Sequence, residues 1–468
     1  MKQRQCKKNY RVNRVKIEFT NKPITAWGGM ACQIGKFLEV IKFREWVESH
    51  IPITEVSPNA KGVYEKVLGQ LLTVLVGGSR FGHLSWWGHG VEAIYKMFAV
   101  AWLPQSASTL TRFWRKIKTH GTAEMMGDAG RQFAKTLWEW ESIGDDNLNF
   151  DSSVLTRYGD QAGAERGYNP KKQGRNSHHP ILAFLGSGYI VNLWNRSGKA
   201  STAHRIVDFF DQTAASLGSA FRIKRVLCDS GFYIFRFMAH LEFLKHLYII
   251  AAPMSRFLQK RIMAIQDWRR LDRGIEIAEF EMAFRDGKQT TLRRFVVARQ
   301  ESAERPKATG KQPFLFKELE DLKNHRYSAM VTNDQALPAE DVWREYRTRA
   351  NDENVFKDLK EGYGFSAFNL NNFWATEAVM VMNALVFYNL VHYFNRNVLN
   401  PNQPQKQLKT LRAEHFILPA QLGNSAGDWV LRLGVRGQKL RGRICHLLER
   451  IMRIPHRLNG NAVATAAP

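Results

Sequence analysis

The chain has 468 residues, of which 44% are hydrophobic and 12% aromatic, and this composition excludes a disordered protein. Lysine and arginine number 68 against 43 acidic residues, which gives a net charge of +25 that is spread along the chain and not gathered in one tail. A positive excess of this size favours a polyanionic partner, and nucleic acid is the leading candidate.

The cysteines and the apolar runs indicate the cellular compartment. Four cysteines are scattered without a Cys-x-x-Cys pair, as expected of free thiols in a reducing compartment: Cys6, Cys32, Cys228 and Cys445. Residues 1–16 lack the apolar core of a signal peptide. The most apolar run, residues 375–391, contains a glutamate and two asparagines. We therefore expect a buried helix there, no membrane contact and a cytoplasmic protein.

The N-terminal part predicts helices after a basic segment. Residues 1–35 are basic, with a loop expected at 25–29. From 36 to 140 apolar residues recur at i, i+3 and i+4, and a Ser/Thr-rich cap at 106–111 opens a basic helix. We predict a helical DNA-binding domain over 36–140 whose basic helix could dock in a major groove, although such helices are equally often plain surface helices.

The pattern turns to α/β at Asn147. Residues 148–155 and the two halves of 179–198, which are joined by Gly-Ser-Gly, predict three antiparallel strands. A helix, a strand, a helix and a strand follow over residues 202–217, 222–228, 233–244 and 246–253. This order matches a ribonuclease H-like core, in which residues from the first and fourth strands meet at one end of the sheet.

A β-rich insertion interrupts this core. Two alternating stretches around Arg285-Asp-Gly-Lys predict a hairpin, which a basic loop follows. A further strand then leads into a helix that carries residues 346–360. We therefore divide the chain into six parts: a basic segment (1–35), a helical DNA-binding domain (36–140), the first part of the core (145–255), the insertion (256–325), the second part of the core (326–400) and a basic C-terminal region (401–468).

The helix over 346–360 presents four polar side chains on one face. Tyr346, Arg349, Glu353 and Lys360 are spaced Y-x2-R-x3-E-x6-K and fall within roughly 60° of one another on an ideal helix. A carboxylate between two cations can hold a divalent ion while the cations grip phosphate oxygens. An ordinary solvated helix face is the alternative interpretation.

Three motifs resemble one family of enzymes. The spacing Y-x2-R-x3-E-x6-K is similar to the signature of DDE transposases of the insertion-sequence 4 type. The stretch beginning at Asp151 and the motif CDSGFY at 228–233 resemble the insertion-sequence 1380 family. The resemblance, firm from about 145 to 365, implies a DNA transposase that binds terminal inverted repeats, hydrolyses phosphodiester bonds at the ends and joins the 3′-OH ends to target DNA. It also implies a homodimer in the synaptic complex and a nucleoid-associated location in a bacterial cytoplasm.

Three carboxylates make up the expected catalytic and metal site. Asp151 and Asp229 fall at predicted strand ends and Glu353 lies on the helix, so the fold would gather them from separate segments. Cleavage with two metal ions needs carboxylates around one phosphate, and oxygen-only ligands suit two Mg2+ ions, with Mn2+ as a substitute. Taken singly, Asp151 is better explained as a strand-end cap and Asp229 as a turn residue. The presence of all three carboxylates in this order, together with the Y-x2-R-x3-E-x6-K spacing, favours a catalytic role over these structural ones.

Neighbouring polar residues receive weaker assignments. We reject three nearby acids as ligands: Asp160, Asp352 and Asp358. Asp352, for example, lies about 100° from the Glu353 face of an ideal helix. His178 and His179 would point to opposite faces of a strand, and we regard them as minor candidates for DNA contact.

A basic turn is the last candidate for phosphate binding. Lys171, Lys172 and Arg175 are placed to neutralise phosphates, and an exposed basic turn is the equal alternative. Two rival functions stand beside transposition: a ribonuclease H-like nuclease without strand transfer, and a transposase-derived DNA-binding protein that no longer cuts.

Overall fold

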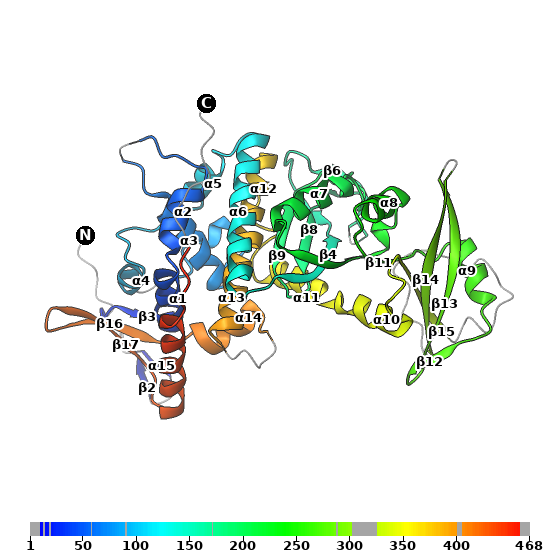
Figure 1. Cartoon of the computed structure of the whole chain (residues 1–468). Coiled ribbons are helices and arrows are strands. Elements are labelled where there is room, and N and C mark those ends of the chain that lie inside the picture. Colours follow the sequence, from blue (N-terminus) through cyan, green and yellow to red (C-terminus); the bar gives the residue numbers. More distant parts are fainter. Residues whose placement is uncertain are drawn as a thin grey trace.

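A nine-stranded mixed sheet runs through the protein, with most helices gathered at one end of it (Figure 1). The mixed α/β class is the one predicted from the sequence. The computed structural model describes residues 10–12, 15–17, 20–57, 59–88, 91–170, 172–286, 289–301, 325–399 and 405–458.

Five strands of the sheet follow the predicted order. Across the sheet they lie as β9-β8-β4-β10-β11, with β8 antiparallel to β4 and β9, and with β10 parallel to β4 and β11. Their bounds are β4 (Asp145–Ser152), β8 (Ile181–Leu185), β9 (Ile190–Trp194), β10 (Arg222–Cys228) and β11 (Tyr248–Ala251). Gly188, with φ of 94°, closes the predicted turn between β8 and β9.

Two helices connect these strands, and a short sheet flanks them. Helix α7 (Ile206–Leu217) precedes β10, and α8 (Phe235–Phe243) precedes β11. Helix α7 begins later than the predicted residue 202, because Arg205 takes a left-handed backbone with φ of 55°. A 3-10 turn η2 (Ser230–Phe232) follows β10, and the flanking sheet consists of β5 (Leu155–Thr156), β7 (Asn176–His178) and β6 (Glu165–Arg166).

The insertion adds strands to the same sheet. Beyond β11 the order continues β15-β14-β13-β12, so the predicted hairpin, β13 with β14, is a lateral extension of the core sheet. The bounds are α9 (Arg256–Met263), β12 (Arg269–Asp272), β13 (Ile275–Asp286), β14 (Gln289–Glu301) and β15 (His325–Thr332). The predicted basic loop at 305–313 lies outside the described residues.

Helix α10 (Ala339–Thr348) packs on this extended sheet. Its buried Ala339 and Val342 belong to an apolar cluster with one residue from each of five strands: Leu227, Ile249, Ile277, Val296 and Met330. Since Ile277 and Val296 come from β13 and β14, the insertion supports the helix that leads into the Tyr346–Lys360 motif.

The N-terminal helices share one apolar core with the sheet. Phe37 and Trp114 lie in the same cluster of buried side chains as Phe150 of β4. The helices are α1 (Gly28–Val40), α2 (Phe43–His50), α3 (Val63–Leu75), η1 (Phe81–His83), α4 (Val91–Met97), α5 (Ala107–Trp114) and α6 (His120–Trp140). Ser106 caps α5 as its sequence predicts. The apolar core is therefore continuous across residue 140, where the sequence predicted the helical domain to end.

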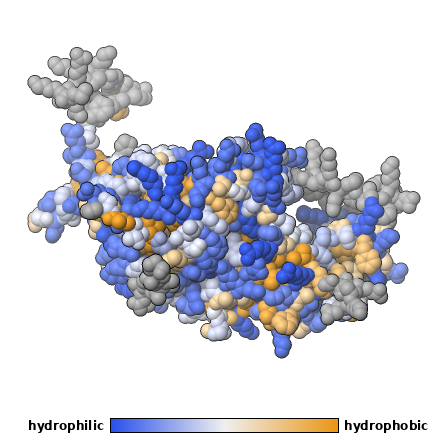
Figure 2. Space-filling view, turned by 90° about the horizontal axis from the view of Figure 1, so that it is seen from above, coloured by the Kyte–Doolittle hydropathy of each residue, from blue (hydrophilic) through white to orange (hydrophobic). Residues whose placement is uncertain are grey.

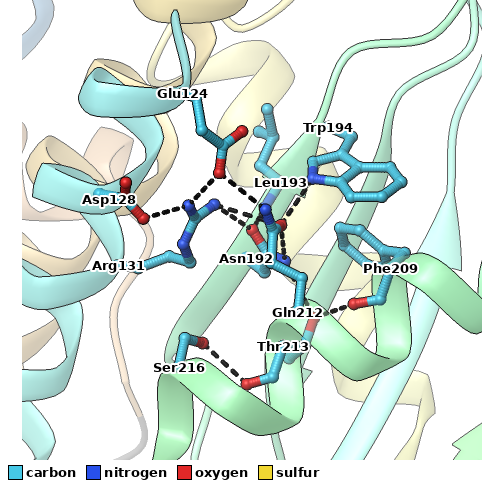
Figure 3. A network of polar contacts seen from close by, with 10 residues as sticks. All are labelled: Glu124, Asp128, Arg131, Asn192, Leu193, Trp194, Phe209, Gln212, Thr213 and Ser216. Atoms are coloured by element: carbon cyan, nitrogen blue, oxygen red, sulfur yellow. Dashed lines mark hydrogen bonds and ion pairs between the residues drawn. The ribbon is translucent and has the colours of Figure 1, made fainter. Parts of the chain in front are cut away.

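A buried arginine of α6 ties this helix to the sheet (Figure 3). Arg131, which is 5% exposed, donates to Glu124 and Asp128 of its own helix at 2.7 and 2.6 Å and to Asn192 of β9 at 3.1 Å. Gln212 of α7 donates to Glu124 at 2.8 Å and accepts from the Trp194 indole at 2.7 Å. These bonds satisfy a charge that would be costly to bury alone.

The most apolar run forms a buried helix, as predicted. It consists of α12 (Phe373–Val381), a π-helical segment η4 (Met382–Tyr388) and α13 (Asn389–Asn397). The helix Phe373–Asn397 is long and apolar enough to cross a membrane, but 89% of its most apolar window is buried inside the protein. Asn389 accepts from the Ile190 amide at 3.0 Å and donates to the Ile190 carbonyl at 2.7 Å, so it satisfies both backbone groups of this residue at the start of the edge strand β9.

The two ends of the chain pack together. Strand β3 (Ile24–Thr25) pairs with the C-terminal hairpin, and α1 packs against α15. The predicted loop at 25–29 is wrong in part, because α1 begins at Gly28. A Cβ on Gly29 would lie 2.1 Å from the His415 carbonyl oxygen, so only glycine allows this approach. The C-terminal elements are α14 (Leu408–Leu411), η5 (Arg412–Phe416), β16 (Ala420–Ser425), β17 (Asp428–Leu433) and α15 (Gln438–Met452).

Hydrophilic residues cover most of the face shown in Figure 2, in keeping with the net charge of +25. Apolar residues gather in this view toward the end that carries the insertion. In the insertion, Phe257 and Leu292 have exposed fractions of 56 and 57%, and Phe243 at the end of α8 has one of 82%. A separate small hairpin joins β1 (Tyr10–Val12) and β2 (Val15–Ile17).

The close approach of α1 to the C-terminal region predicts an effect on stability. Gly29→Ala should lower the free energy of unfolding by about 1–3 kcal/mol, because the new methyl group forces the His415 carbonyl away. Gly121→Ala in α6 is the matched control, since a Cβ there meets no atom within 4 Å, and it should be neutral or stabilising. Thermal unfolding measures both. A Gly29→Ala protein as stable as wild type would contradict the packing.

Candidate active site

Parallel pairing of β4 and β10 brings two predicted carboxylates to adjacent strand ends. Phe150 pairs with Cys228, and each strand then continues into an aspartate, Asp151 and Asp229. The Asp151 carboxylate accepts from the Ser152 amide at 2.8 Å. Asp229 accepts from the Gly231 amide at 2.9 Å and so also makes the turn contact that was its alternative interpretation.

The predicted helix over 346–360 is interrupted at Arg349. Helix α10 ends at Thr348 and α11 (Ala350–Glu361) begins after Arg349, which caps both. The single ideal helix predicted from the sequence is therefore wrong at this residue. Because the angles of an ideal helix do not carry across the break, Tyr346 on α10 and Lys360 on α11 need not share one helical face.

Arg349 turns inward at this break. Its Nη2 lies 3.6 Å from Asp151 Oδ2 and 3.4 Å from the Phe150 carbonyl oxygen, and its side chain is 12% exposed. Burial opposes the charge on Arg349, but Asp151, Tyr346 and Asp352 outweigh it and raise the pKa of Arg349. The guanidinium is thus a charged partner of the first carboxylate.

Tyr346 and Lys360 lie at two ends of the same region. The Tyr346 hydroxyl is 3.5 Å from Arg349 Nη1, and its ring centroid is 6.0 Å from the guanidinium carbon. Lys360 donates to the hydroxyl of Ser153, two residues beyond Asp151 in sequence. Lys360 therefore contacts the chain just after Asp151 directly, whereas Tyr346 is linked to this strand end through Arg349.

Asp352, which we reject as a ligand from the sequence because it lies off the Glu353 face, is buried against β4. Asn149 of β4 donates to Asp352 Oδ1 at 3.1 Å, and Arg349 Nε lies 3.8 Å from Oδ2. Glu353 is exposed. Burial, opposed by the Asn149 hydrogen bond and by Arg349, raises the pKa of Asp352 to about 7. Asp352 and Glu353 both lie in α11, about 100° apart, so the face of this helix that meets β4 carries Asp352 and leaves Glu353 exposed.

The charges of Asp229 and Glu353 both act on Asp151. Burial raises the pKa of Asp151 to about 6; Arg349 opposes this shift, whereas Asp229 and Glu353 add to it. A cation among these acids would relieve their repulsion, and their oxygen donors suit a hard divalent ion. In the part of the chain that the structure describes, no three His, Cys, Asp or Glu side chains stand close enough to hold an ion without moving.

The two histidines are structural. His178 accepts at Nδ1 from Arg157 at 3.1 Å, so its Nε2 is protonated and donates to the Ala162 carbonyl at 3.0 Å. Burial, with the Arg157 charge, lowers the pKa of His178 to about 4. His179 bonds the Ser152 hydroxyl at 3.0 Å and the Ala200 carbonyl at 2.7 Å. Both rings support the loops around Asp151.

The basic turn stands apart from these contacts. Lys172 and Arg175 are exposed, and the Arg175 amide donates to the Lys172 carbonyl at 3.2 Å within the turn. Lys171 lies outside the described residues. An exposed turn of this kind is compatible with both interpretations, a phosphate contact and a plain basic loop.

Comparisons with known proteins give a family. Residues 102–455 match the sequence model of the family described as "Transposase DDE domain group 1". No curated protein matches the chain. Among solved structures, a piggyBac transposase in a synaptic complex with hairpin DNA is similar at 10% identity, over 83% of this chain and 79% of that chain, with a TM-score of 0.41.

The raised pKa of Asp151 predicts a pH-dependent difference in stability without divalent ions. A raised pKa means that the stability contributed by the neutral acid is complete below about pH 4 and is lost as the pH rises through about 6. Asp151→Asn should therefore melt above the wild type at pH 8 and level with it near pH 4. Thermal unfolding in a chelator measures this difference.

Asp145→Asn is the control with the opposite sign. Hydrogen bonds from Arg222 and Lys224 lower the pKa of Asp145, so this variant should lose stability at pH 8. A gap between wild type and Asp151→Asn that stays constant from pH 4 to pH 8 would contradict the raised pKa of Asp151.

Proposed function

The chain belongs to the transposase DDE domain group 1 family, and we propose that it is the transposase of an insertion sequence of the 1380 type. It would bind the terminal inverted repeats, hydrolyse phosphodiester bonds at the ends and join the freed 3′-OH ends to target DNA. The Tyr346, Arg349, Glu353 and Lys360 spacing supports the insertion-sequence 4-like signature within this family.

One observation carries the proposal. Asp151 and Asp229 follow paired residues on parallel strands, and the motif that contains Glu353 is held against the same strand end by Arg349 and Lys360. Parallel neighbours deliver their carboxyl-terminal residues to one edge of a sheet. This arrangement supports a site in which Asp151, Asp229 and the exposed Glu353 would approach one phosphodiester together.

The residues present fit divalent ions in their chemistry. Asp151, Asp229 and Glu353 would hold two Mg2+ ions, or Mn2+ in their place. When bound, these ions supply Lewis-acid stabilisation of the attacking and leaving oxygens of the phosphate. Binding would also favour the charged form of Asp151, whose pKa is raised by burial and, to a lesser extent, by the charges of Asp229 and Glu353. None of the three acids needs to act as a nucleophile in this scheme.

The remaining residues of the motif would position DNA. Arg and Lys stay protonated at neutral pH, so Arg349 and Lys360 are unsuited to act as general bases, and their role is charge neutralisation and orientation. The Tyr346 hydroxyl could donate to a phosphate on the same strand. Lys172 and Arg175 are exposed and could contact phosphates farther along the duplex.

The arrangement of the chain fits this function. The strand order β9-β8-β4-β10-β11 with α7 and α8 as connections supports a ribonuclease H-like core. We assign DNA binding to the N-terminal helices, and we expect a homodimer in the synaptic complex, because two ends must be cut together. Since those helices share the core of the sheet, their contribution should be tested in the full chain.

Replacing the carboxylates tests the assignment. Asp151→Ala, Asp229→Ala and Glu353→Ala should each abolish Mg2+-dependent cleavage of end-containing DNA, because each removes an ion ligand, while DNA binding is largely kept. Asp341→Ala, which removes an exposed acid of α10 that pairs with Arg344, is the control and should cut normally. Full cleavage by any of the three variants would remove that residue from the site.

The same assay separates transposition from simple hydrolysis. Cleaved ends supplied with a target duplex should become joined to it through their 3′-OH groups. Cutting without joining would favour a nuclease, and binding without cutting would favour a DNA-binding protein.

The positive charge predicts a steep dependence of DNA binding on salt. The logarithm of the association constant for non-specific duplex should fall by about 0.9 per contacted phosphate for each tenfold rise in salt. Lys172→Ala and Arg175→Ala should each reduce this slope by about 1. Titrations between low and moderate salt measure it. An unchanged slope in both variants would place the basic turn outside the DNA interface.

A further inference from the structure

We propose that Asp352 is a positioning residue that shares Arg349 with Asp151 and thereby sets how readily Asp151 exchanges its guanidinium partner for a divalent ion. This inference rests on the proposed function of the carboxylates. It concerns an acid that the spacing of the motif leaves out, and it acts through Arg349.

The geometry places one cation between two acids. Arg349 Nη2 is 3.6 Å from Asp151 Oδ2, and Arg349 Nε is 3.8 Å from Asp352 Oδ2. The three side chains are 12, 15 and 5% exposed for Arg349, Asp151 and Asp352. Charges screened so little by water interact strongly at these separations. Arg349 therefore neutralises each acid in part and neither of them fully.

Neither contact is a hydrogen bond. Both distances exceed hydrogen-bonding length, and Arg349 Nε and Asp352 Oδ2 are buried without a hydrogen-bond partner among the described residues. The guanidinium is otherwise held by two long contacts, 3.4 Å to the Phe150 carbonyl and 3.5 Å to the Tyr346 hydroxyl. The guanidinium of Arg349 is therefore held near Asp151 mainly by electrostatic attraction, so a metal ion can displace it from this carboxylate.

Among Arg349, Asp151 and Asp352, the carboxylate of Asp352 stays in place when an ion binds. Its Oδ1 accepts from Asn149, which lies two residues before Asp151 on β4, and its Oδ2 faces Arg349. When an ion takes Asp151, the guanidinium keeps a charged partner in Asp352 and does not become a lone buried cation. Leaving it alone would carry the cost of an unpaired buried charge. Asp352 thus lowers the free energy needed to release Asp151.

The proposal predicts that the Mn2+ affinity falls when Asp352 is replaced and rises when Arg349 is replaced. Without the charge of Asp352, Arg349 has Asp151 as its main partner, and an incoming ion must break a stronger pair. Asp352→Asn should therefore weaken Mn2+ binding by about three- to tenfold, within the range of couplings between charged neighbours. Arg349→Gln removes the competitor and should strengthen Mn2+ binding by a similar factor.

A double-mutant cycle identifies the route of the effect. In the Arg349→Gln background, Asp352→Asn should change the Mn2+ affinity little, because Asp352 acts through Arg349. An equal loss in both backgrounds would show instead that Asp352 acts directly as a ligand or a nearby charge, and would overturn the proposal. Glu361→Gln, which removes an exposed acid at the end of the same helix, is the control for charge alone.

The experiment titrates Mn2+ into the full chain without DNA at pH 8 and follows free Mn2+ by electron paramagnetic resonance. Thermal unfolding shows that each variant is folded, and Asp352→Ser replaces Asp352→Asn if the latter is not. Wild-type affinity in the Asp352 variant, or no gain in Arg349→Gln, overturns the proposal. If Asp151→Ala also binds Mn2+ as the wild type does, the proposed metal site fails and not only the role of Asp352.

Discussion

Parallel pairing of β4 with β10 is the constraint on which the site depends. The register that joins Phe150 to Cys228 places Asp151 and Asp229 side by side at one edge of the sheet. Two partly buried carboxylates so placed repel each other, and burial raises the pKa of Asp151 to about 6. The fold offsets this cost with the guanidinium of Arg349, which the break between α10 and α11 directs inward.

The position of Arg349 depends in turn on the insertion. Helix α10 rests on an apolar cluster that includes Ile277 and Val296 of the long hairpin, and this hairpin is continuous with the core sheet through β15. A segment that looks like an accessory insertion in the sequence is therefore part of the support for the motif. At the opposite end, Arg131 and the shared apolar core attach α6 to β9 and α7. The site therefore lies between the insertion on one side and the packed N-terminal helices on the other.

Local patterns in the sequence were sufficient for much of the fold. The alternation in β4, the Gly-Ser-Gly turn before β9 and the long apolar helix are each encoded within a short window. The break at Arg349 was not predictable in this way, because no proline or glycine marks it and helix-forming residues continue through it. The pairing of β15 with β11 and β14, and the start of α1 at Gly28, depend on partners far away in sequence.

For the site residues, too, local spacing was predictable from the sequence and contacts between distant segments were not. Spacing groups Tyr346, Arg349 and Lys360 but does not show their contacts. Arg349 lies near the Phe150 carbonyl and the Tyr346 hydroxyl, whereas Lys360 donates to Ser153. Asp352 lies on a different face of α11 from Glu353, as an ideal helix predicts, but it is the Asp352 face that packs against β4, and spacing alone does not show which face does so. Acids buried with one shared cation leave the ion-free site electrostatically unsatisfied. Ligands that bind only the folded state add to its stability, so an ion bound at Asp151 would stabilise the folded chain while Arg349 keeps Asp352 as its charged partner.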